Sequence, residues 1–574
     1  MAGTRCLLAG AVWVAGAVLA GCSGTGSQGT GSGGTTATGG VSATGSGGVT
    51  SPAGTGGHSA SGGTTAGSGG ATTANGGAAP ASGGITAPAS GGAGGKPASA
   101  GSGGRQVASG GSAGHAPATG GRAGASAQGG GAGGTNVPGS GGSAGTTGLS
   151  PALTKTGETL LTDAGLTIVS YGGYLNGESF QEDGVVSYAG YQYAAFWNSA
   201  RHVVVARRAL PAGAWTRVEL TDYTNSEDDA HNTISLGVCP GDGTLHLAFD
   251  HHGSTLHYRK SVSDLITHPD SAAWTASSFS AVTGALVGAT TVTQVTYPRF
   301  VTEPGGGKML FEARIGASGS GDEYLWEYSA ASHAWISLGR YIDGTTDSIN
   351  AYPHGLTYGR GGTRLHLAWC WRETPDATTN HDLLYIYSDD NGRTWKNNDG
   401  ATVATTGTSS ASRSSTGIKV WTIDQNRGLI NQEHLAVDDA GRVHVLLSHL
   451  PDGQPDDSNF DSARTKTQYF DYWRDPTGRW TRTAMGLPSI ANFRGKLAIS
   501  SSGDVYAVLP DLRIAAASPA TNFATWVVLD TSDKGRFFSD PLIDTARLST
   551  EDSLTVIYPQ KSSGNIYALE YTVR

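Results

Sequence analysis

The residue types best suited to chemistry lie between His231 and Arg314. His231 opens a His-Asn-Thr sequence, His252 follows an apolar run, and Tyr297 precedes a proline. Histidine exchanges protons near neutral pH, tyrosine donates or accepts a proton, and arginine holds a carboxylate through two parallel hydrogen bonds. These types suit removal of a proton from a carbon next to a carboxylate. We therefore expect β-elimination on an acidic sugar.

Each of these side chains also has a structural interpretation. Tyr297 could be a strand-end aromatic, and Arg314 could pair with Glu312 or another acid. His251 and His252 are adjacent, and successive strand residues face opposite ways, so one of the two should face a cleft. The acidic residues near this stretch are Asp228, Asp229 and Asp250, and we interpret them as turn and strand-end residues.

The elements that must position these residues are short strands. Runs rich in Val, Ile, Tyr, Trp and Thr are separated by Gly, Asp, Asn and Ser turns, which predicts an all-β fold. One strand type recurs at intervals of about 53 to 78 residues. Its copies begin at Tyr191, Leu245, Lys308, Leu365, Val443, Val505 and Ile566. His246, His366 and His444 hold the same place in this repeat, so we expect them to be structural.

This repeat predicts a seven-bladed β-propeller, with a pair of β-sandwiches or a β-helix as the alternative. A strand near residues 158–170 could complete the last blade and close the ring. Residues 388–395 match the Asp-box, Ser-x-Asp-x-Gly-x-Thr-Trp, which resembles the turns of sialidase-like propellers. We expect its aspartate to accept backbone N–H groups, its glycine to supply an unusual backbone angle, and its tryptophan to fill the blade. This motif indicates fold and carries no chemistry.

The first 149 residues differ from the rest of the chain. Arg5 and the short apolar stretch at residues 7–19 predict an export signal, and Leu19-Ala20-Gly21-Cys22 resembles a bacterial lipobox. An ordinary signal that ends in cysteine is the alternative. Residues 23–149 are rich in Gly, Ser, Thr and Ala without any Asp or Glu, which predicts a flexible linker. We therefore expect a signal at 1–22 with lipidation at Cys22, a linker at 23–149, and a propeller at 150–574.

The charge and the cysteine content argue against several classes of protein. The net charge of the chain is −9. All 46 acidic residues lie within residues 150–574, whereas four of the basic residues lie in the first 149, so residues 150–574 are more acidic than the whole chain. This excess of acid argues against nucleic acid, while a local cluster of Arg and His can still bind an acidic polymer. We expect Cys239 and Cys370 to be small core residues, with one disulfide or a metal ligand as the alternative. Metal-site spacings such as CxxC and HExxH are absent from the sequence, so we expect no cofactor, and a structural metal ion stays open.

The same motifs resemble the BNR-repeat family that includes the propeller ulvan lyases. The similarity covers most of residues 155–574 and is strongest at about 185–330. It implies a lyase active site of His231, His252, Tyr297 and Arg314, with His251 as a near alternative to His252. We assign Tyr297 and His231 as the acid/base pair, and His252 with Arg314 as the groups that neutralise the carboxylate. Further residues expected to bind substrate are Asn232, His251, Arg299, Trp197 and His354.

The leading interpretation is an exported polysaccharide lyase, a monomer tethered by lipid to the outer membrane or cell surface. Its partners would be an ulvan-like uronate polymer and, through the anchor alone, a membrane. A glycoside hydrolase on the same scaffold is one alternative, and it would need two carboxylic acids. A glycan-binding lipoprotein is another alternative, and it would need aromatic residues such as Trp197 and Trp371 near the mouth of the propeller's central channel. A sialidase is disfavoured because we cannot place its three arginines.

Overall fold

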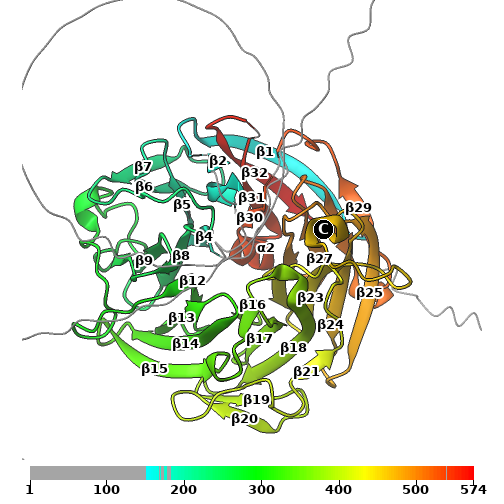
Figure 1. Ribbon diagram of the computed structural model, residues 1–574. Helices are drawn as coiled ribbons and strands as arrows, with labels where there is room; N and C mark the ends of the chain where they lie inside the picture. Colours follow the sequence, from blue (N-terminus) through cyan, green and yellow to red (C-terminus); the bar gives the residue numbers. More distant parts are fainter. Residues whose placement is uncertain (1–149, 167, 170–172, 178–182, 538, 561) are drawn as a thin grey trace, which may run out of the picture. The chain divides into compact units, whose positions relative to one another are not determined.

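The computed structural model describes residues 150–574 apart from 167, 170–172, 178–182, 538 and 561. Antiparallel sheets are arranged in chain order around a centre (Figure 1). The chain has a β-propeller fold. The signal, lipobox and linker predicted for residues 1–149 lie outside the described residues. Of the helices that the structure describes, none has the length and apolar character needed to cross a membrane.

The first two strand groups follow the order of the sequence. The first comprises β4 (Val185–Tyr188), β5 (Tyr191–Trp197), β6 (Val203–Ala209) and β7 (Thr216–Leu220). The second comprises β8 (Ile234–Cys239), β9 (Thr244–Phe249) and β11 (Tyr258–Lys260). A short hairpin, β2 (Ile168–Val169) and β3 (Gly173–Tyr174), precedes them. The first two groups share one hydrophobic cluster, which includes Tyr193, Val205, Leu236 and Leu247.

An eleven-stranded sheet holds the next two groups, joined by one parallel contact between Gly321 and Asn350. The first of them comprises β10 (His252–Ser254), β12 (Val295–Thr302), β13 (Lys308–Ala317), β14 (Ser320–Ser329) and β15 (Ala334–Ile342). The second comprises β16 (Asn350–Tyr358), β17 (Leu365–Arg372), β18 (Asn380–Ser388), β19 (Thr394–Lys396), β20 (Thr402–Thr405) and β21 (Lys419–Trp421). This sheet carries most of the candidate site.

The remaining groups complete the ring. One comprises β22 (His434–Val437), β23 (Val443–His449), β24 (Gln468–Arg474) and β25 (Trp480–Pro488), with helix α1 (Phe460–Arg464) between β23 and β24. The next comprises β26 (Lys496–Ile499), β27 (Val505–Val508), β28 (Ile514–Ala517) and β29 (Val527–Asp530). The last has the order β1-β32-β31-β30, from β30 (Leu542–Ile543), β31 (Ser553–Pro559), β32 (Ile566–Val573) and β1 (Leu153–Thr162), and helix α2 (Thr545–Glu551) precedes β31.

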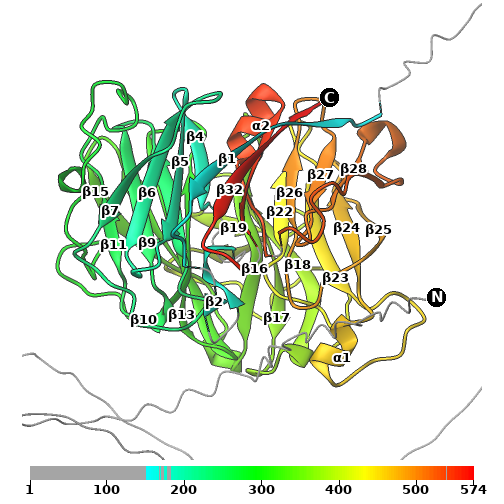
Figure 2. The same cartoon turned by 90° about the horizontal axis from the view of Figure 1, so that it is seen from above.

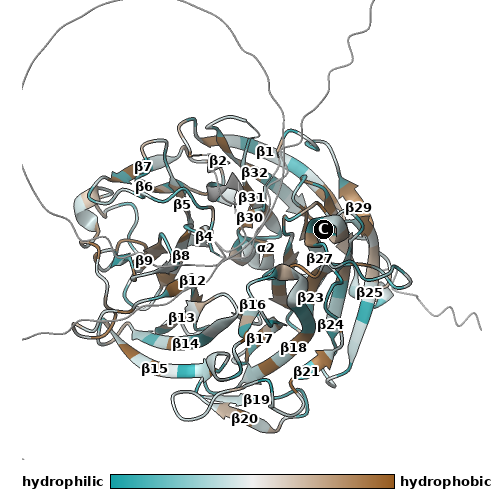
Figure 3. Ribbon diagram, in the orientation of Figure 1, coloured by the Kyte–Doolittle hydropathy of each residue, from teal (hydrophilic) through white to brown (hydrophobic). Residues whose placement is uncertain are grey.

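A strand from the start of the described chain closes the ring as predicted, but it begins and ends earlier than the expected residues 158–170. Strand β1 pairs antiparallel with β32, with Leu153 opposite Val573, so the first described strand completes the last group. Each sequence copy falls in a separate strand group, and five of the first six lie on the second strand of their group. The copy at Lys308 lies on β13, which follows β10 and β12. The copy at Ile566 lies on the third strand, β32, and the second strand of that group is β31 instead. Hydrophobic residues concentrate in the strands, whereas the loops are largely hydrophilic (Figure 3).

The Asp-box joins β18 to β19 as predicted. Asp390 Oδ1 accepts hydrogen bonds from the backbone N–H of Thr394 (2.8 Å) and Arg393 (3.2 Å). Gly392 has a φ of 78°, in the left-handed region that favours glycine. Trp395 is fully buried, and its ring stacks on Tyr341. The motif fixes this hairpin and takes no part in the candidate site.

The repeated histidines and both cysteines are core residues, as predicted. His246 and His366 each place Nδ1 at 2.7 Å from a tyrosine hydroxyl, that of Tyr258 and that of Tyr385 respectively. His444 places Nδ1 at 3.1 Å from Asp471. Cys239 and Cys370 are buried free thiols. These side chains therefore serve packing.

Candidate active site

The strand ladder aligns part of the site across three neighbouring strands. His252 on β10 lies opposite Thr296 on β12, and Thr296 lies opposite Arg314 on β13. Tyr297 follows Thr296 directly, and His231 lies just before the inner strand β8. In Figure 2, β10 lies at the lower face of the ring, the face that also carries α1. All four predicted catalytic residues therefore gather at one end of neighbouring strands.

His231 and His252 form a stacked pair held by one carboxylate. Their ring centroids lie 4.1 Å apart, and the planes differ by 10°. Nδ1 of His231 lies 2.6 Å from Oδ1 of Asp229, and Nδ1 of His252 lies 2.6 Å from Oδ2 of the same residue. The backbone N–H of His231 also donates to Asp229 Oδ1 at 2.9 Å. Asp229 therefore holds both histidines in addition to its place in the turn that the sequence indicated.

The electrostatics of this trio keep His231 neutral near neutral pH. Burial lowers the pKa of His231 to about 4, His252 and Arg494 act in the same direction, and Asp229 opposes them. For Asp229, burial would raise the pKa, but hydrogen bonds from both histidines outweigh it and hold the pKa below its usual range. The resting site thus contains an ionised carboxylate beside an uncharged His231 ring.

Tyr297 faces this pair from a strained backbone position. Its φ is 57°, which is rare for a residue with a side chain, and the β12–β13 register shifts between Thr296 and Arg299. Its ring centroid lies 6.0 Å from that of His231. Strain of this kind is found where surrounding structure forces a side chain into a functional direction. The bulge turns Tyr297 out of the regular alternation of β12.

Arg314 supplies a buried positive charge beside Tyr297. Its guanidinium carbon lies 4.8 Å from the Tyr297 ring centroid and 5.6 Å from that of Tyr352, and the residue is 2% exposed. Within the described residues, its Nε and Nη1 atoms have no hydrogen-bond partner. Glu323 lies opposite on β14, but burial, reinforced by Glu312, raises its pKa well above its usual value. The raised pKa favours the uncharged form of Glu323, so Glu323 offsets less of the charge of Arg314.

Tyr352 is a site residue that sequence analysis missed. It lies on β16, its ring centroid is 5.9 Å from that of Tyr297, and its hydroxyl accepts a hydrogen bond from Arg372 Nη1 at 2.9 Å. Burial would raise the pKa of Tyr352, but Arg372 and Arg314 outweigh it and bring the pKa below its usual value. A sequence signal existed: Tyr297-Pro298 and Tyr352-Pro353 repeat the same dipeptide on neighbouring inner strands.

Two residues predicted to bind substrate lie in the interior instead. Trp197 is fully buried and donates its indole N–H to the Asn232 carbonyl at 2.8 Å. His251 points into its own group, where Nδ1 lies 3.0 Å from Ser254 Oγ and burial lowers its pKa to about 3. Of the two adjacent histidines, His252 is therefore the one at the site. Trp371, considered for glycan binding, is also buried.

The other three predicted binding residues serve contacts between strands. Asn232 is buried and donates its side-chain amide to Asp250. Arg299 forms an ion pair with Glu312 at 2.8 Å and donates to the Pro353 carbonyl at 3.1 Å, which links β12 to β16. His354 is fully buried, its Nδ1 accepts from the backbone N–H of Glu433 at 3.2 Å, and burial lowers its pKa to about 3. Their geometry supports the wall of the site.

Asp229, His231 and His252 also form a group whose ligand-type atoms lie within 4.8 Å of one another. Hydrogen bonds from the two Nδ1 atoms to Asp229 already account for this spacing. A cation at these atoms would have to displace both Nδ1 protons. We therefore describe the group as a hydrogen-bonded trio.

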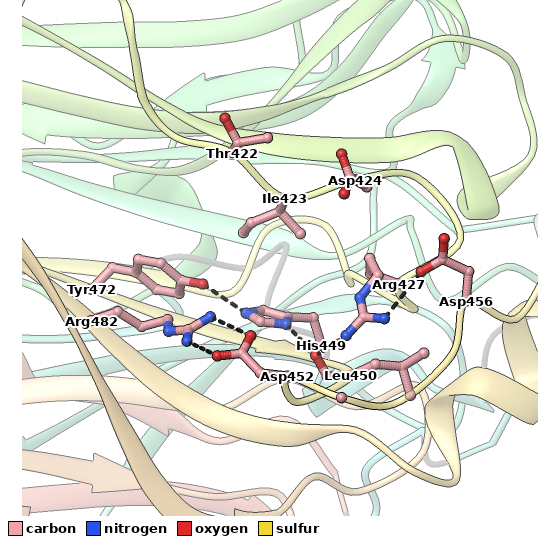
Figure 4. A pocket seen from close by; sticks show the side chains of 11 residues that line it. Thr422, Ile423, Asp424, Arg427, His449, Leu450, Asp452, Asp456, Tyr472 and Arg482 are labelled. Atoms are coloured by element: carbon pink, nitrogen blue, oxygen red, sulfur yellow. Dashed lines mark hydrogen bonds and ion pairs between the residues drawn. The ribbon is translucent and has the colours of Figure 1, made fainter.

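A polar pocket of about 230 Å³ lies elsewhere, at the ends of β23 and β24 (Figure 4). Its side chains are largely paired with one another. Arg482 bonds Asp452, Arg427 bonds Asp456, and His449 Nε2 lies 2.7 Å from the Tyr472 hydroxyl. The predicted catalytic residues do not line this pocket, so its chemistry is separate from theirs.

Comparison with known proteins places these features in a family. Residues 191–486, which include all four predicted catalytic residues, match the BNR repeat-containing family. The chain belongs to this family.

A curated relative of this BNR repeat-containing protein is an ulvan lyase, long isoform, from Pseudoalteromonas sp. (strain PLSV), 25% identical over 262 residues. An Alteromonas sp. (strain LOR) ulvan lyase, long isoform, shows the same identity and coverage. Each match spans 38% of this chain and 26% of the relative, so the chain matches about a quarter of their length.

Solved structures agree on the fold of this BNR repeat-containing chain. The polysaccharide lyase Uly1 superposes with a TM-score of 0.57 at 16% identity, over 73% of this chain and 99% of that one. An ulvan lyase of family PL25 bound to -[GlcA(1-4)Rha3S]- gives a TM-score of 0.51 at 13% identity, over 72% of this chain and 95% of that one. At these identities the likeness concerns the fold.

Proposed function

We propose that this protein is a polysaccharide lyase that cleaves a uronate-containing polymer by β-elimination. The observation that carries the proposal is the grouping of Arg314, Tyr297, His231 and His252 around one position. Arg314 brings a buried positive charge with two N–H-bearing nitrogens that lack a partner among the described residues, and the other three bring groups that exchange protons. The similarity to ulvan lyases supports a polymer of glucuronate and sulfated rhamnose as the substrate class.

The chemistry begins at the carboxylate of the uronate. Its negative charge makes the neighbouring C5 proton hard to remove, because the carbanion adds charge next to it. Arg314 would bind that carboxylate through two parallel hydrogen bonds and stabilise the enolate-like intermediate. The guanidinium stays protonated in proteins, so its charge is present at every working pH.

Proton transfer completes the elimination. A base takes the C5 proton, the electron pair forms the C4–C5 double bond, the C4–O4 bond breaks, and an acid returns a proton to O4. We assign His231 as the base, because its neutral ring accepts a proton, and Tyr297 as the acid. His252 shares its carboxylate with His231, so we assign carboxylate binding chiefly to Arg314.

A hydrolase on the same site has weaker support. That reaction needs one carboxylic acid and one carboxylate flanking the scissile bond. Both oxygens of Asp229 are occupied by histidines, and Asp250 accepts from Tyr223 and Asn232. Asp228 is exposed and pairs with Arg201. This arrangement favours elimination over hydrolysis.

Export and lipid anchoring complete the proposal. Cys22 would carry the lipid, and residues 23–149 would act as a tether between the membrane and a monomeric propeller. The proposed reaction involves no redox step and requires no cofactor. Detergent phase partition of the wild-type protein and of Cys22→Ala tests the anchor: the variant should move to the aqueous phase.

The deciding experiment is ultraviolet absorbance of the protein incubated with ulvan and with a panel of other uronate polymers. Elimination leaves a C4–C5 double bond conjugated to the carboxylate, so the absorbance should rise with at least one polymer. His231→Ala should abolish the rise. New reducing ends without absorbance would assign the protein to the hydrolases, and glycan binding without either signal would make it a binding protein.

A further inference from the structure

One carboxylate holds two stacked imidazoles, and this geometry constrains where their protons lie. An ionised carboxylate only accepts hydrogen bonds. Both contacts to Asp229 run from Nδ1, at 2.6 Å each, so each Nδ1 must carry its proton. In a neutral imidazole the other nitrogen is then an acceptor, because the bond made by one nitrogen sets the tautomer of the ring.

We propose that Asp229 is a positioning residue that holds His231 and His252 together in the Nδ1–H tautomer, which makes Nε2 of each ring the proton acceptor. This inference rests on the proposed lyase function only for its kinetic consequence. The tautomers themselves are a property of the folded protein. Asp229 acts through the two histidines and is not itself a catalytic residue.

Stacking adds a second constraint. Two protonated rings with centroids 4.1 Å apart would repel each other, and one carboxylate can offset only one added charge. The groups around the pair are Tyr297, whose ring lies 6.0 Å from that of His231, and the cation Arg494, which disfavours protonation of His231. Arg314 lies beyond Tyr297 and adds further positive charge. The pair therefore binds one proton at a time.

The geometry also explains why two histidines are held together. The carboxylate bonds one ring from β10 and one from the segment before β8, which belong to different strand groups. Fixing both Nδ1 atoms on one anchor fixes the spacing of the two Nε2 atoms. Preorganisation of this kind lowers the entropy lost when substrate binds.

The test uses the full-length protein labelled with ¹⁵N-histidine, since imidazole ¹⁵N shifts report which nitrogen carries the proton. The His231→Gln and His252→Gln spectra assign the signals. In the wild-type protein both rings should show protonated Nδ1 and unprotonated Nε2 at neutral pH. A wild-type ring with protonated Nε2 and bare Nδ1 would overturn the proposal without any need for a variant.

Asp229→Asn gives the second measurement. The amide has one acceptor oxygen and one donor nitrogen, so one of the two rings must switch to the Nε2–H tautomer. We expect kcat to fall by about 10³-fold or more, as for a wrong tautomer in a Ser-His-Asp triad, with KM changed by less than about threefold. The loss should persist across the pH range, because the defect is a tautomer and not a shifted titration.

The matched control is Asp228→Asn, which changes the neighbouring exposed residue paired with Arg201. Its ¹⁵N spectrum and kcat should match those of the wild type. If both rings of Asp229→Asn keep their Nδ1 protons, the positioning role is wrong even where the wild-type protein is an active lyase. If the tautomer switches but the wild-type protein cleaves no uronate polymer, the positioning role stands and the proposed function fails.

Discussion

Tyr297 and Tyr352 occupy equivalent places on the neighbouring inner strands β12 and β16, each before a proline, and their ring centroids lie 5.9 Å apart. The guanidinium of Arg314 faces both rings. Contact with two aromatic faces holds the cation in place, and its Nε and Nη1 donors lack a partner among the described residues. Arg314 is thus fixed in position and keeps donors for a carboxylate.

Replacement of Arg314 by Lys tests this arrangement. Lysine keeps the charge but loses the planar pair of donors, so kcat/KM should fall by about 10²-fold to 10³-fold. The measurement is initial rate from ultraviolet absorbance at subsaturating polymer. Arg340→Lys is the control, because Arg340 lies on β15 and pairs with Asp322, and its rate should stay near that of the wild type. Equal losses in both variants would refute a special role for Arg314.

Removal of the two tyrosine hydroxyls should have unequal effects. If Tyr297 protonates the leaving oxygen, Tyr297→Phe should lower kcat by about 10²-fold to 10⁴-fold. Tyr352→Phe should lower kcat less, because the Tyr352 hydroxyl already accepts from Arg372 and lies beside Ser318. Full pH profiles of kcat for both variants give the comparison. A larger loss in Tyr352→Phe would reverse the assignment of the acid.

The protein should lose stability as the pH falls from about 6.5 towards 4. Burial lowers the pKa of His246, His251, His354, His366 and His449 to about 3 and that of His231 to about 4. Above pH 6.5 these rings are neutral whether the chain is folded or not. Below it the unfolded chain binds protons that the folded chain excludes, so the free energy of unfolding decreases by up to about 1.4 kcal/mol per pH unit per ring.

A single substitution isolates one of these rings. His366→Gln should flatten the dependence of unfolding free energy on pH by about 1.4 kcal/mol per pH unit between pH 6 and 4. His268→Gln is the matched control, because His268 is exposed. Urea titrations at a series of pH values provide the data. Equal slopes in the wild type and His366→Gln would show that His366 is not buried as a neutral ring.

The Asp-box should matter for stability and not for catalysis. Asp390→Ala removes the acceptor of two backbone N–H groups, so the free energy of unfolding should fall by about 1–3 kcal/mol with kcat unchanged. Asp389→Ala removes only exposed ion pairs to Arg364 and Lys396 and should cost less than about 1 kcal/mol. Urea unfolding measures both. A loss of kcat in folded Asp390→Ala would contradict the structural role.

Chelation should leave the activity intact. The proposed elimination uses Arg314 to stabilise negative charge and requires no metal, so incubation with excess EDTA should change kcat by less than about twofold. Addition of Zn²⁺ to the chelated protein provides the comparison. An activity that disappears with EDTA and returns with Zn²⁺ would show that the Asp229 trio, or another set of residues, acts through a cation.

The sequence predicted the propeller fold because the strand repeat is a local pattern. The four candidate residues came from the resemblance to the BNR-repeat lyases, and their catalytic roles stay a prediction. The strand repeat places each copy in its own group, and the spacing of His231, His252, Tyr297 and Arg314 follows the order of neighbouring strands. The prediction for Trp197 was wrong because the sequence pattern of an alternating strand is the same whether its aromatic residue faces the core or the mouth of the central channel. Asp229 and Tyr352 were missed because their roles depend on contacts between strand groups, which periodicity within one strand does not reveal.

The pairing of β1 with β32 has a consequence for how the protein is made. Leu153 meets Val573, so the strand that completes the last group leaves the ribosome long before its partner exists. Until β32 is synthesised, β1 has no edge to join, and the last group cannot form. The ring therefore closes only after translation of almost the whole sequence, and the nascent chain stays an open row of strand groups until its final strand arrives.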